Sequence, residues 1–379
     1  MVQPLRKLTK TDEAAPIALA PARGEDWRAL GGHALEAAGG TMPAWIEPQV
    51  QILGSSSPPL GIWQKGRLLG VVALERQNAR WLPGWPVDVS FETPFFFSGL
   101  PLIAEDRADA AIESLIADRG VPLLLKSIPI DGPFWDALCR ATRKLNAPVA
   151  IIAQWQRAAL RPGGNYSAWF ETNFERKRRK EYRRWRARLG EMGKLESLNW
   201  KQGERLDPWF ADFLALEAKG WKGKRGSAIG CDAALSDCLR SQLEQLAQAG
   251  HLRFWSIRLD GRPIASLFAH VIGGKAWLGK IAFDEDHAKY SPGVLQILDA
   301  TEALFAEGDI ALADSCAAPD HPMIDNIWRD RIMMADLLIG TPNMPPARFK
   351  AMMAAEAFRR RGRNAAKDVY NRFIRRQKS

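Results

Sequence analysis

Three apolar runs lie between residues 251 and 283, and short glycine-containing pairs separate them. Asp260-Gly261 stands between the first two runs, and Gly273-Gly274 stands between the second and the third. Both pairs favour the positive φ values of tight hairpin turns. The pattern therefore predicts three antiparallel strands that form a meander.

A helix is predicted to begin directly after the third strand, at Ser291-Pro292-Gly293. Ser291 is placed as the N-cap, and Pro292 suits the first helical position because its missing N–H costs nothing there. The first turn of a helix carries unpaired amides and a partial positive charge, so it can hold a pyrophosphate without any lysine. We therefore expect the main chain from Ser291 through Pro292 and Gly293 to Val294 to face outward and bind phosphate.

The segments around the meander alternate between helical and strand patterns. Leucines recur at helical spacing in 231–250, and Asp207 and Pro208 are placed as cap and first residue of an earlier helix. The whole order predicted from residue 194 to residue 340 is β, α, α, β, β, β, α, β, α, β. The outer elements are a strand at 194–200, helices at 206–221 and 231–250, a helix up to 308, a strand at 309–315, a helix around 321–331 and a strand at 331–340.

The first half of the chain contains a weaker copy of this arrangement. Residues 61–77 parallel residues 254–270, and Gly66-Arg67 aligns with Gly261-Arg262. A helical run at 109–117 follows, as the helix follows the meander in the second half. Such self-similarity predicts two related domains in tandem. The predicted fold class is α/β (α+β), in which each domain is a mixed, mostly antiparallel sheet flanked by helices.

Four regions follow from this pattern. The predicted boundaries are a degenerate N-terminal domain at 1–155, a linker with a basic amphipathic helix at 156–194, a C-terminal domain at 195–345 and a basic C-terminal helix at 346–379. Phe174, Tyr182 and Leu189 belong to the apolar stripe of the first basic helix, which is predicted to run from Trp169 to Gly193. The C-terminal helix is expected to dock through a seam of apolar side chains. Its members are Phe349, Met352, Met353 and Phe358.

Composition supports a large folded core and adds an uneven charge. The chain has 379 residues, of which 46% are hydrophobic and 25% are charged, and its net charge is +10. Residues 174–189 hold nine lysines and arginines against two glutamates, and residues 346–379 hold eleven against two acidic residues. The remainder is acidic overall, so the two basic segments are expected to face polyanions or an anionic surface.

Composition also argues against a secreted, membrane-spanning or metal-binding protein. Pro16 and Pro21 interrupt the apolar patch near the N-terminus, and no apolar span of 18 residues occurs in the sequence. Four cysteines are scattered, with no pair or His/Cys cluster at zinc-ligand spacing. We therefore expect a reduced, metal-free, cytoplasmic protein.

Four stretches carry a resemblance to a known family: 174–193, 213–223, 258–293 and 313–331. With the strand and helix order, they resemble the GNAT acyltransferase superfamily, and most closely its CelD/BcsL-like branch, which is associated with cellulose and other envelope polysaccharides and is related to the FemAB-type transferases. The resemblance implies that acetyl-CoA or another acyl-CoA is the donor, held at Ser291 to Val294. Many GNAT enzymes carry Gln/Arg-x-x-Gly-x-Gly there, whereas this chain has Tyr-Ser-Pro-Gly.

Acyl transfer needs a route for the acceptor proton and stabilisation of an oxyanion. Lys280 lies in an apolar strand, where it either reaches a cleft and meets developing negative charge or points to solvent. Tyr290 either protonates the leaving thiolate or packs as an aromatic staple. In the related families the segment at 213–223 borders the acceptor site. Glu217 is therefore interpreted in two ways, as a general base or as an ordinary exposed glutamate.

Further candidates are weaker. Trp221 and Lys222 are predicted to bind the acceptor, with Trp221 stacking on a sugar face. Asp314 ends a predicted strand, where it either contacts ligand or caps a turn. No histidine is assigned a catalytic role, although His321 is worth testing. Cys316 is expected to be a buried bystander.

The resulting function is an acyl-CoA-dependent N- or O-acyltransferase that moves an acetyl or other short acyl group to a sugar-containing or envelope polysaccharide-related acceptor. One alternative is a FemAB-like transferase that uses aminoacyl-tRNA. The other is a non-catalytic subunit of a polysaccharide synthesis complex. The arginine-rich helix fits coenzyme or acceptor phosphates, tRNA phosphates or an anionic inner-membrane surface, and it also fits a merely solvated face.

Overall fold

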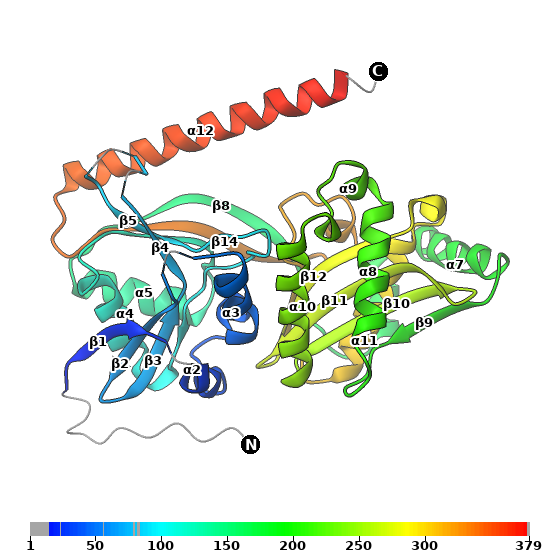
Figure 1. The fold of residues 1–379 in the computed structure, drawn as a ribbon, viewed down its shortest axis with the longest axis horizontal. Coiled ribbons are helices and arrows are strands. Elements are labelled where there is room, and N and C mark those ends of the chain that lie inside the picture. The colour runs from blue at the N-terminus through cyan, green and yellow to red at the C-terminus, as the bar shows by residue number, and fades with distance from the viewer. Residues whose placement is uncertain (1–14, 23, 56, 79, 82–83, 377–379) are drawn as a thin grey trace. The chain divides into compact units, whose positions relative to one another are not determined.

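The chain folds as two compact units in the computed structural model (Figure 1). The structure describes residues 15–22, 24–55, 57–78, 80–81 and 84–376. Unit 1 comprises the described residues of 1–36, 56–155 and 334–379, and unit 2 comprises those of 37–55 and 156–333. Residues 1–14 of the N-terminal segment for which no signal or span was predicted lie outside the described residues.

Unit 2 is built on a mostly antiparallel sheet whose strands run in the order β8, β13, β12, β11, β10, β9. The three strands of the predicted meander are β10, β11 and β12, and both of their turns have positive φ, as predicted. The elements are α3 (Pro43–Ile52), β8 (Val149–Leu160), α6 (Tyr166–Asn173), α7 (Arg176–Gly190), β9 (Leu195–Asn199), α8 (Asp207–Lys219), α9 (Trp221–Lys224), α10 (Ala233–Gln248), β10 (Leu252–Leu259), β11 (Arg262–Ile272), β12 (Lys275–Phe283), the 3-10 helix η4 (Glu285–Tyr290), α11 (Pro292–Glu307) and β13 (Leu312–Asp314).

Alternation along β10 and β11 sends Phe254 and Phe268 to one face of this sheet and Trp255 and Leu267 to the other. Phe254 and Phe268 face α8, where the ring of Phe213 lies 5.5 Å from Phe268 and 6.4 Å from Phe254 between centroids. The opposite face packs against α11. The helices therefore cover both faces of the sheet (Figure 1).

A β-bulge interrupts the pairing of β11 with β12. Leu267 pairs with Ile281 and Ala269 pairs with Leu278, so two residues of β12, Gly279 and Lys280, stand opposite one residue of β11. Bulges re-aim the side chains beside them and are frequent next to active sites. The bulge therefore changes the direction in which Lys280 leaves the strand.

Gly279 is required at this bulge because the ring of Phe268 lies against its Cα. A Cβ added at Gly279 would meet that ring at 2.0 Å. We expect Gly279→Ala to lower the free energy of unfolding by about 1–3 kcal/mol, the usual cost of overpacking. Urea denaturation measures it, with Gly163→Ala as the control because a Cβ there meets nothing within 4 Å. Equal stability of the two variants would show that the ring moves aside freely.

Unit 1 has a second, smaller arrangement of the same kind. One sheet has the order β1, β2, β3, β6, and the other runs β4, β5, β7, β14. The elements are β1 (Ile17–Pro21), α2 (Gly24–Gly31), β2 (Leu60–Gln64), β3 (Arg67–Val72), β4 (Leu74–Gln77), β5 (Val87–Ser90), β6 (Leu102–Ile103), α4 (Ala108–Ala117), β7 (Leu123–Pro129), α5 (Pro133–Lys144), β14 (Asp330–Ile339) and α12 (Pro346–Arg376).

Two strands, β8 and β14, each begin in one unit and end in the other. β8 follows α5 of unit 1, yet its end pairs with β13 of unit 2. β14 follows unit 2, yet its second half pairs with β7 of unit 1. The two hairpins aligned by sequence also share a two-residue turn with positive φ, at Lys65-Gly66 and at Asp260-Gly261. The fold class is therefore confirmed as a tandem of mixed, mostly antiparallel domains flanked by helices.

The compact units are assembled from separate segments of the chain, whereas the predicted regions are continuous. The division after residue 155 coincides with the predicted one. However, residues 37–55 and the predicted linker region 156–194 belong to unit 2, and the C-terminal helix belongs to unit 1. A strand that leaves its own unit cannot be recognised from local periodicity, because its pattern is the same in either sheet.

Three local predictions were wrong. The helix predicted from Trp169 to Gly193 is two helices, α6 and α7, separated by an extended Phe174 (φ −124°, ψ 139°). In place of a helix, the segment 321–331 contains a 3-10 turn at Ile324–Asn326 and the start of β14 at Asp330. Asp207 is the first residue of α8 rather than its cap.

The two basic segments are both helical, and their apolar stripes face the body of their own units. Phe174, Tyr182 and Leu189 are buried, as are Phe349 and Met352 of α12. Phe358 was predicted to join the apolar seam of α12. This prediction is wrong, because Phe358 is 80% exposed. No helix among the described residues is long and apolar enough to cross a membrane.

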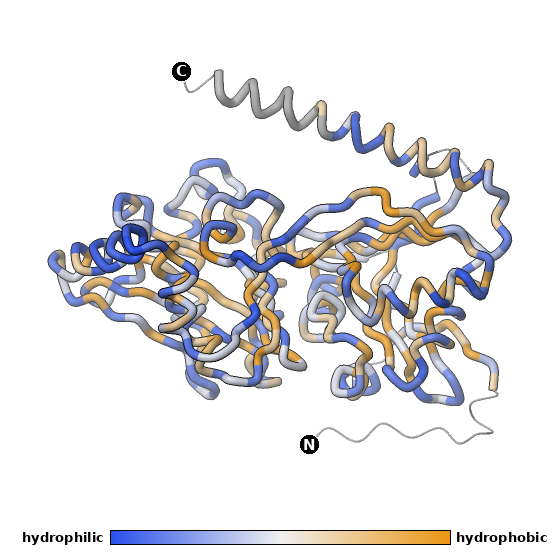
Figure 2. Tube along the Cα trace, turned by 180° about the vertical axis from the view of Figure 1, so that it is seen from behind, coloured by the Kyte–Doolittle hydropathy of each residue, from blue (hydrophilic) through white to orange (hydrophobic). Residues whose placement is uncertain are grey.

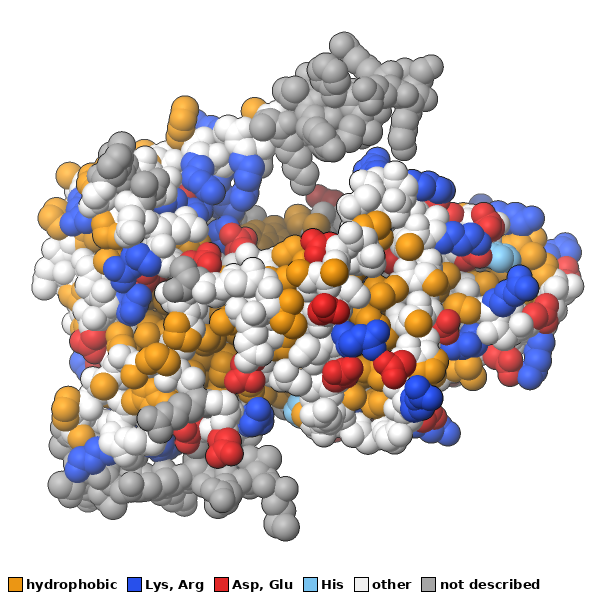
Figure 3. Space-filling model, in the orientation of Figure 1, with side chains coloured by type: hydrophobic (Ala, Val, Ile, Leu, Met, Phe, Trp, Pro, Cys, Tyr) orange, Lys and Arg blue, Asp and Glu red, His pale blue; other side chains and the backbone are white. Residues whose placement is uncertain are grey.

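Charged side chains are distributed differently over the surface. Figure 2 shows that hydrophilic residues occupy almost the whole length of helix α7. On the face of unit 2 seen in Figure 3, basic and acidic side chains are interspersed. Such mixing produces ion pairs in unit 2, for example between Arg258 and Asp212 at 2.6 Å. The basic excess of unit 2 is therefore concentrated on α7.

Candidate functional site

The parallel pairing of β12 with β13 ends early. Lys275, Ala276 and Trp277 pair with residues 312–314, and β12 then continues to Phe283 without this neighbour. The pairing stops two residues before the bulge at Gly279 and Lys280. The second half of β12 therefore presents a main-chain edge that a ligand can pair with.

Three charged groups meet beside this edge. Glu217 on α8 is only 4% exposed, and its Oε1 lies 2.6 Å from Nζ of Lys222. Its Oε2 accepts the N–H of Ile229 at 2.8 Å. Burial lowers the pKa of Lys280, the positive charge of Lys222 lowers it further, and the negative charge of Glu217 opposes both. The structure thus brings together Lys280, Glu217 and Lys222, which lie up to 63 positions apart in sequence.

A small cavity of about 40 Å³ lies beside these groups, lined in part by Trp221, Ile281 and Phe283. It has room for about one water molecule, so it accommodates a reacting group rather than a whole sugar ring. Trp221 is 52% exposed at its edge, where the guanidinium of Arg225 lies 5.1 Å from the indole ring.

Ion pairs hold the segments around the cavity together. Lys219 lies 2.8 Å from Asp284, and Lys224 lies 2.8 Å from Glu285, which also accepts the N–H of Trp221 at 2.6 Å. The hydrogen bond from Lys224 lowers the pKa of Glu285. These contacts tie α8 and α9 to the segment 284–285 beside the cavity.

The first turn of α11 is less open than predicted. Ser291 is the N-cap residue with left-handed backbone (φ 46°, ψ 56°), and Pro292 is the first helical residue, as predicted. However, the N–H of Ser291 donates to Ala288 at 2.9 Å, and the N–H of Val294 donates to Ser291 at 2.9 Å. Gly293 is buried against Phe283 and Met323. The expectation of outward-facing amides is therefore wrong for Ser291 and Val294.

Tyr290 lies with a different set of residues from Lys280. Its ring packs beside Leu189 of α7 and Leu295 of α11, and Nζ of Lys289 lies 4.8 Å from the ring centroid. This is the packing role considered for Tyr290 from sequence. Its role as a general acid stays a prediction.

Asp314 is engaged in structural contacts. Its Oδ2 lies 3.1 Å from Arg157, both side chains being almost fully buried, and its Oδ1 accepts the N–H of Cys316 at 2.8 Å. This is the Asx-turn geometry considered from sequence. Burial, reinforced by the charge of Asp314, raises the pKa of the Cys316 thiol, which disfavours a thiolate nucleophile.

Histidines also fill structural positions. Burial lowers the pKa of His270 to about 3, and its ring stacks between Trp45 and Trp277 at centroid distances of 5.0 and 5.2 Å. His321 lies at the 3-10 turn, where its Nδ1 is 3.4 Å from the N–H of Met323. Among the described residues, no group of His, Cys, Asp or Glu is arranged to hold a metal ion.

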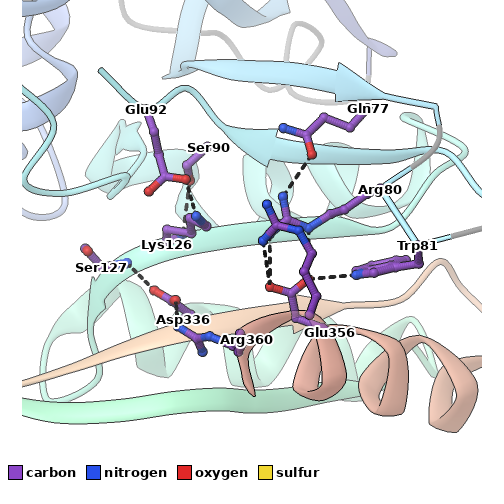
Figure 4. Close-up of polar contacts among 11 residues, drawn as sticks. Gln77, Arg80, Trp81, Ser90, Glu92, Lys126, Ser127, Asp336, Glu356 and Arg360 are labelled. Atoms are coloured by element: carbon purple, nitrogen blue, oxygen red, sulfur yellow. Dashed lines mark hydrogen bonds and ion pairs between the residues drawn. The ribbon is translucent and has the colours of Figure 1, made fainter. Parts of the chain in front are cut away.

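In unit 1 the strands that correspond to β12 and β13 are β5 and β7, and side chains bridge them where β12 has an open edge. β5 and β7 pair in parallel at Asp88–Leu123 and Val89–Leu124, as β12 and β13 do in unit 2. Beyond this point the Ser90 hydroxyl accepts the N–H of Lys126 at 3.0 Å, and the ammonium of Lys126 pairs with Glu92 (Figure 4). These side chains bridge the two strands, so the open edge is a feature of unit 2.

The comparisons with known proteins agree with this assignment of the site to unit 2. Residues 176–321 match the family model described as "Acetyltransferase (GNAT) domain". This part of the chain is a GNAT acetyltransferase domain. It contains α7, the bulged strand β12, the open edge and the three charged groups. No similar sequence was found among the curated proteins.

Solved structures share the fold of the whole chain. The crystal structure of FemX is similar with a TM-score of 0.56 at 9% identity, covering 88% of this chain and 100% of that chain. A conserved protein of unknown function from Bacteroides thetaiotaomicron VPI-5482 gives 0.50 at 9% identity, covering 86% and 100%. A tandem GNAT protein from the clavulanic acid biosynthesis pathway gives 0.42 at 14% identity, covering 87% and 100%. The chain therefore carries a GNAT acyltransferase domain at residues 176–321, and FemX shares its fold.

Proposed function

We propose that this GNAT protein transfers an acetyl or other short acyl group from coenzyme A to an amine or hydroxyl of a sugar-containing acceptor. GNAT domains use acyl-CoA donors. The observation that carries the proposal is the open edge of β12, which lies beside the bulge that directs Lys280. Main-chain groups along such an edge offer hydrogen bonds to the amides of a pantetheine arm.

The charged groups beside the edge fit acyl transfer. The acceptor nitrogen or oxygen forms a bond to the acyl carbon, the C–S bond breaks, the acceptor loses a proton and the thiolate takes one up. The ammonium of Lys280 meets the negative charge that develops on the carbonyl oxygen. Glu217 holds Lys222, because both of its oxygens are engaged. These contacts support a positioning role for Glu217, and the general-base role considered from sequence stays a prediction.

The acceptor is proposed from the surroundings of the small cavity. The cavity admits only a reacting amine or hydroxyl, and the half-exposed ring of Trp221 offers a flat surface for a sugar beside it. A link to cellulose or other envelope polysaccharides rests on the resemblance to the CelD/BcsL-like branch. A cytoplasmic enzyme lying at the inner membrane is part of the same proposal.

A second candidate donor is aminoacyl-tRNA, which α7 favours. Seven exposed cations on this helix exceed what one coenzyme A requires. A donor with many phosphates would use most of them and would bind with a steep salt dependence. The cations are Arg176, Lys177, Arg178, Lys180, Arg183, Arg184 and Arg188.

Titration calorimetry and a thiol-release assay distinguish these donors. We expect heat on adding acetyl-CoA or a longer acyl-CoA, and release of free thiol when amino sugars or oligosaccharides are added as acceptors. Binding of charged tRNA with indifference to every acyl-CoA would favour the second candidate. Binding of neither donor would overturn both.

A further inference from the structure

A second cavity in unit 2, of about 520 Å³, lies between the C-terminal half of α7 and the end of η4. Its volume is within the range of small-molecule sites. It lies directly before the first turn of α11, because Lys289 and Tyr290 line it and Ser291 follows them. The full lining is Arg184, Trp185, Arg188, Glu191, Met192, Lys289 and Tyr290.

The lining combines cations with aromatic rings. Arg184 and Arg188 are one helical turn apart on α7, and Lys289 approaches them from η4. Glu191 is the only acid in the lining, and it pairs with Arg188 at 2.8 Å through side chains that are more than half exposed. The cavity therefore keeps a net positive charge beside the faces of Trp185 and Tyr290, a combination suited to a phosphate group next to a flat base.

The closed first turn of α11 explains why cationic side chains are needed to bind phosphate here. Its amides at Ser291 and Val294 donate within the chain, so the main chain there can neutralise little of a ligand's phosphate charge. Side chains must then supply the donors, and arginine does so in a bidentate manner. Arg184, Arg188 and Lys289 are the exposed cations beside that turn.

We propose that this cavity binds the phosphorylated nucleoside end of the acyl donor, with phosphates on Arg184, Arg188 and Lys289 and the base against Trp185 or Tyr290. The proposal rests on the proposed function, since it concerns the donor of the same transfer. Coenzyme A and the 3′ end of an RNA both carry such a phosphorylated nucleoside.

The rest of the cationic stripe distinguishes these two sources. Of the seven exposed cations of α7, Arg178 pairs with Glu181. At 100° per residue, the other six lie within a sector of about 140°. Among the described residues, Arg176, Lys177 and Lys180 at its other end form no ion pair. Coenzyme A reaches only the end of the stripe at the cavity, whereas RNA follows the whole of it.

The test measures binding of adenosine 3′,5′-bisphosphate, coenzyme A and a short RNA ending in CCA to the full chain. Arg184→Ala/Arg188→Ala should weaken the nucleotide probes about 10-fold or more, because charge-assisted hydrogen bonds are lost. Lys201→Ala/Arg205→Ala, an equal loss of exposed charge elsewhere in unit 2, is the matched control. Lys177→Ala/Lys180→Ala should weaken only the RNA and reduce its salt dependence.

Outcomes separate this inference from the proposed function. If Arg184→Ala/Arg188→Ala raises KM for acetyl-CoA but leaves turnover of acetyl-pantetheine unchanged, the cavity holds the nucleotide. If acyl transfer from acetyl-CoA occurs with unchanged KM in this variant, the inference is overturned while the proposed function stands. If adenosine 3′,5′-bisphosphate binds in an Arg184-dependent manner but no acyl group is transferred, the inference stands and the proposed function fails.

Discussion

Replacing Glu356 with alanine should lower the free energy of unfolding by about 3–5 kcal/mol, as expected when one partner of a buried ion pair is removed. Glu356 lies on α12 and accepts hydrogen bonds from Arg80 at 2.9 Å and from the indole N–H of Trp81 at 2.7 Å (Figure 4). The side chains of Arg80 and Glu356 are 2% and 3% exposed. Without the carboxylate, the Arg80 guanidinium stays buried with Gln77 as a neutral partner at 2.8 Å.

Urea denaturation followed by circular dichroism measures this loss. Lys350→Ala is the matched control, because Lys350 is an exposed residue of the same helix. The control should change stability by less than about 0.5 kcal/mol. A Glu356→Ala variant as stable as the control would show that apolar packing at Phe349 and Met352 alone holds α12.

The same pair predicts a pH dependence of known sign. Burial alone would raise the pKa of Glu356, but the hydrogen bonds and charge of Arg80 outweigh it and lower the pKa below its ordinary 4.5. A carboxylate with a lowered pKa stabilises the folded state fully above its unfolded value and loses this contribution as pH falls through its folded value. The stability difference between wild type and Glu356→Gln should therefore be constant from pH 7 to about 5 and shrink below 4.5. A difference that grows on acidification contradicts this assignment.

Glu356 also shows what the sequence could not reveal. The apolar stripe of the C-terminal helix was predicted, and Phe349 and Met352 are buried as expected. Glu356 counted only as one of two acids in a basic segment. Its partner Arg80 is 276 positions away, and periodicity carries no information about such a pairing.

Elements set by local chemistry were predictable. Asp260-Gly261 and Gly273-Gly274 have positive φ because few other residue pairs adopt it easily, and Pro292 begins α11. The wrong prediction of a helix at 321–331 shows the limit of inferring helices from the spacing of apolar residues. Ile324 and Trp328 are buried at helical spacing, yet the indole N–H of Trp328 bonds to Thr301, and packing of this kind holds them without a full helix.

The candidate site was predictable in its residue types and not in its geometry. Lys280, Glu217 and Lys222 were chosen from an apolar strand and from a resemblance, and they lie together. The glycine inside that strand was an available indication of the bulge at Gly279. No such indication exists in the sequence for Arg157, the partner of Asp314. Their ion pair depends on the pairing of β8 with β13, two strands far apart in the sequence.

Replacing Lys280 with methionine should lower kcat by about 10²–10³-fold, the usual effect of removing one group that stabilises an oxyanion. The affinity for acyl-CoA should change little, because the proposed pantetheine contacts use the main chain of β12 and the proposed nucleotide contacts use other side chains. Rapid-quench or steady-state thiol release gives kcat, and calorimetry gives the donor affinity. Lys201→Met is the control, an exposed lysine of the same unit.

The pH profile distinguishes this role from a structural one. Lys280 acts as a cation, so kcat/KM should fall as pH rises through its pKa, which burial and the charge of Lys222 place below the ordinary 10.5. Lys222→Met removes a positive neighbour and frees the charge of Glu217, and both changes raise this pKa and move the alkaline limb to higher pH. Glu217→Gln removes the opposing negative charge and moves the limb to lower pH. Limbs that stay in place in both variants would show that another group titrates, and Lys280 would then serve the fold of β12 rather than the transfer.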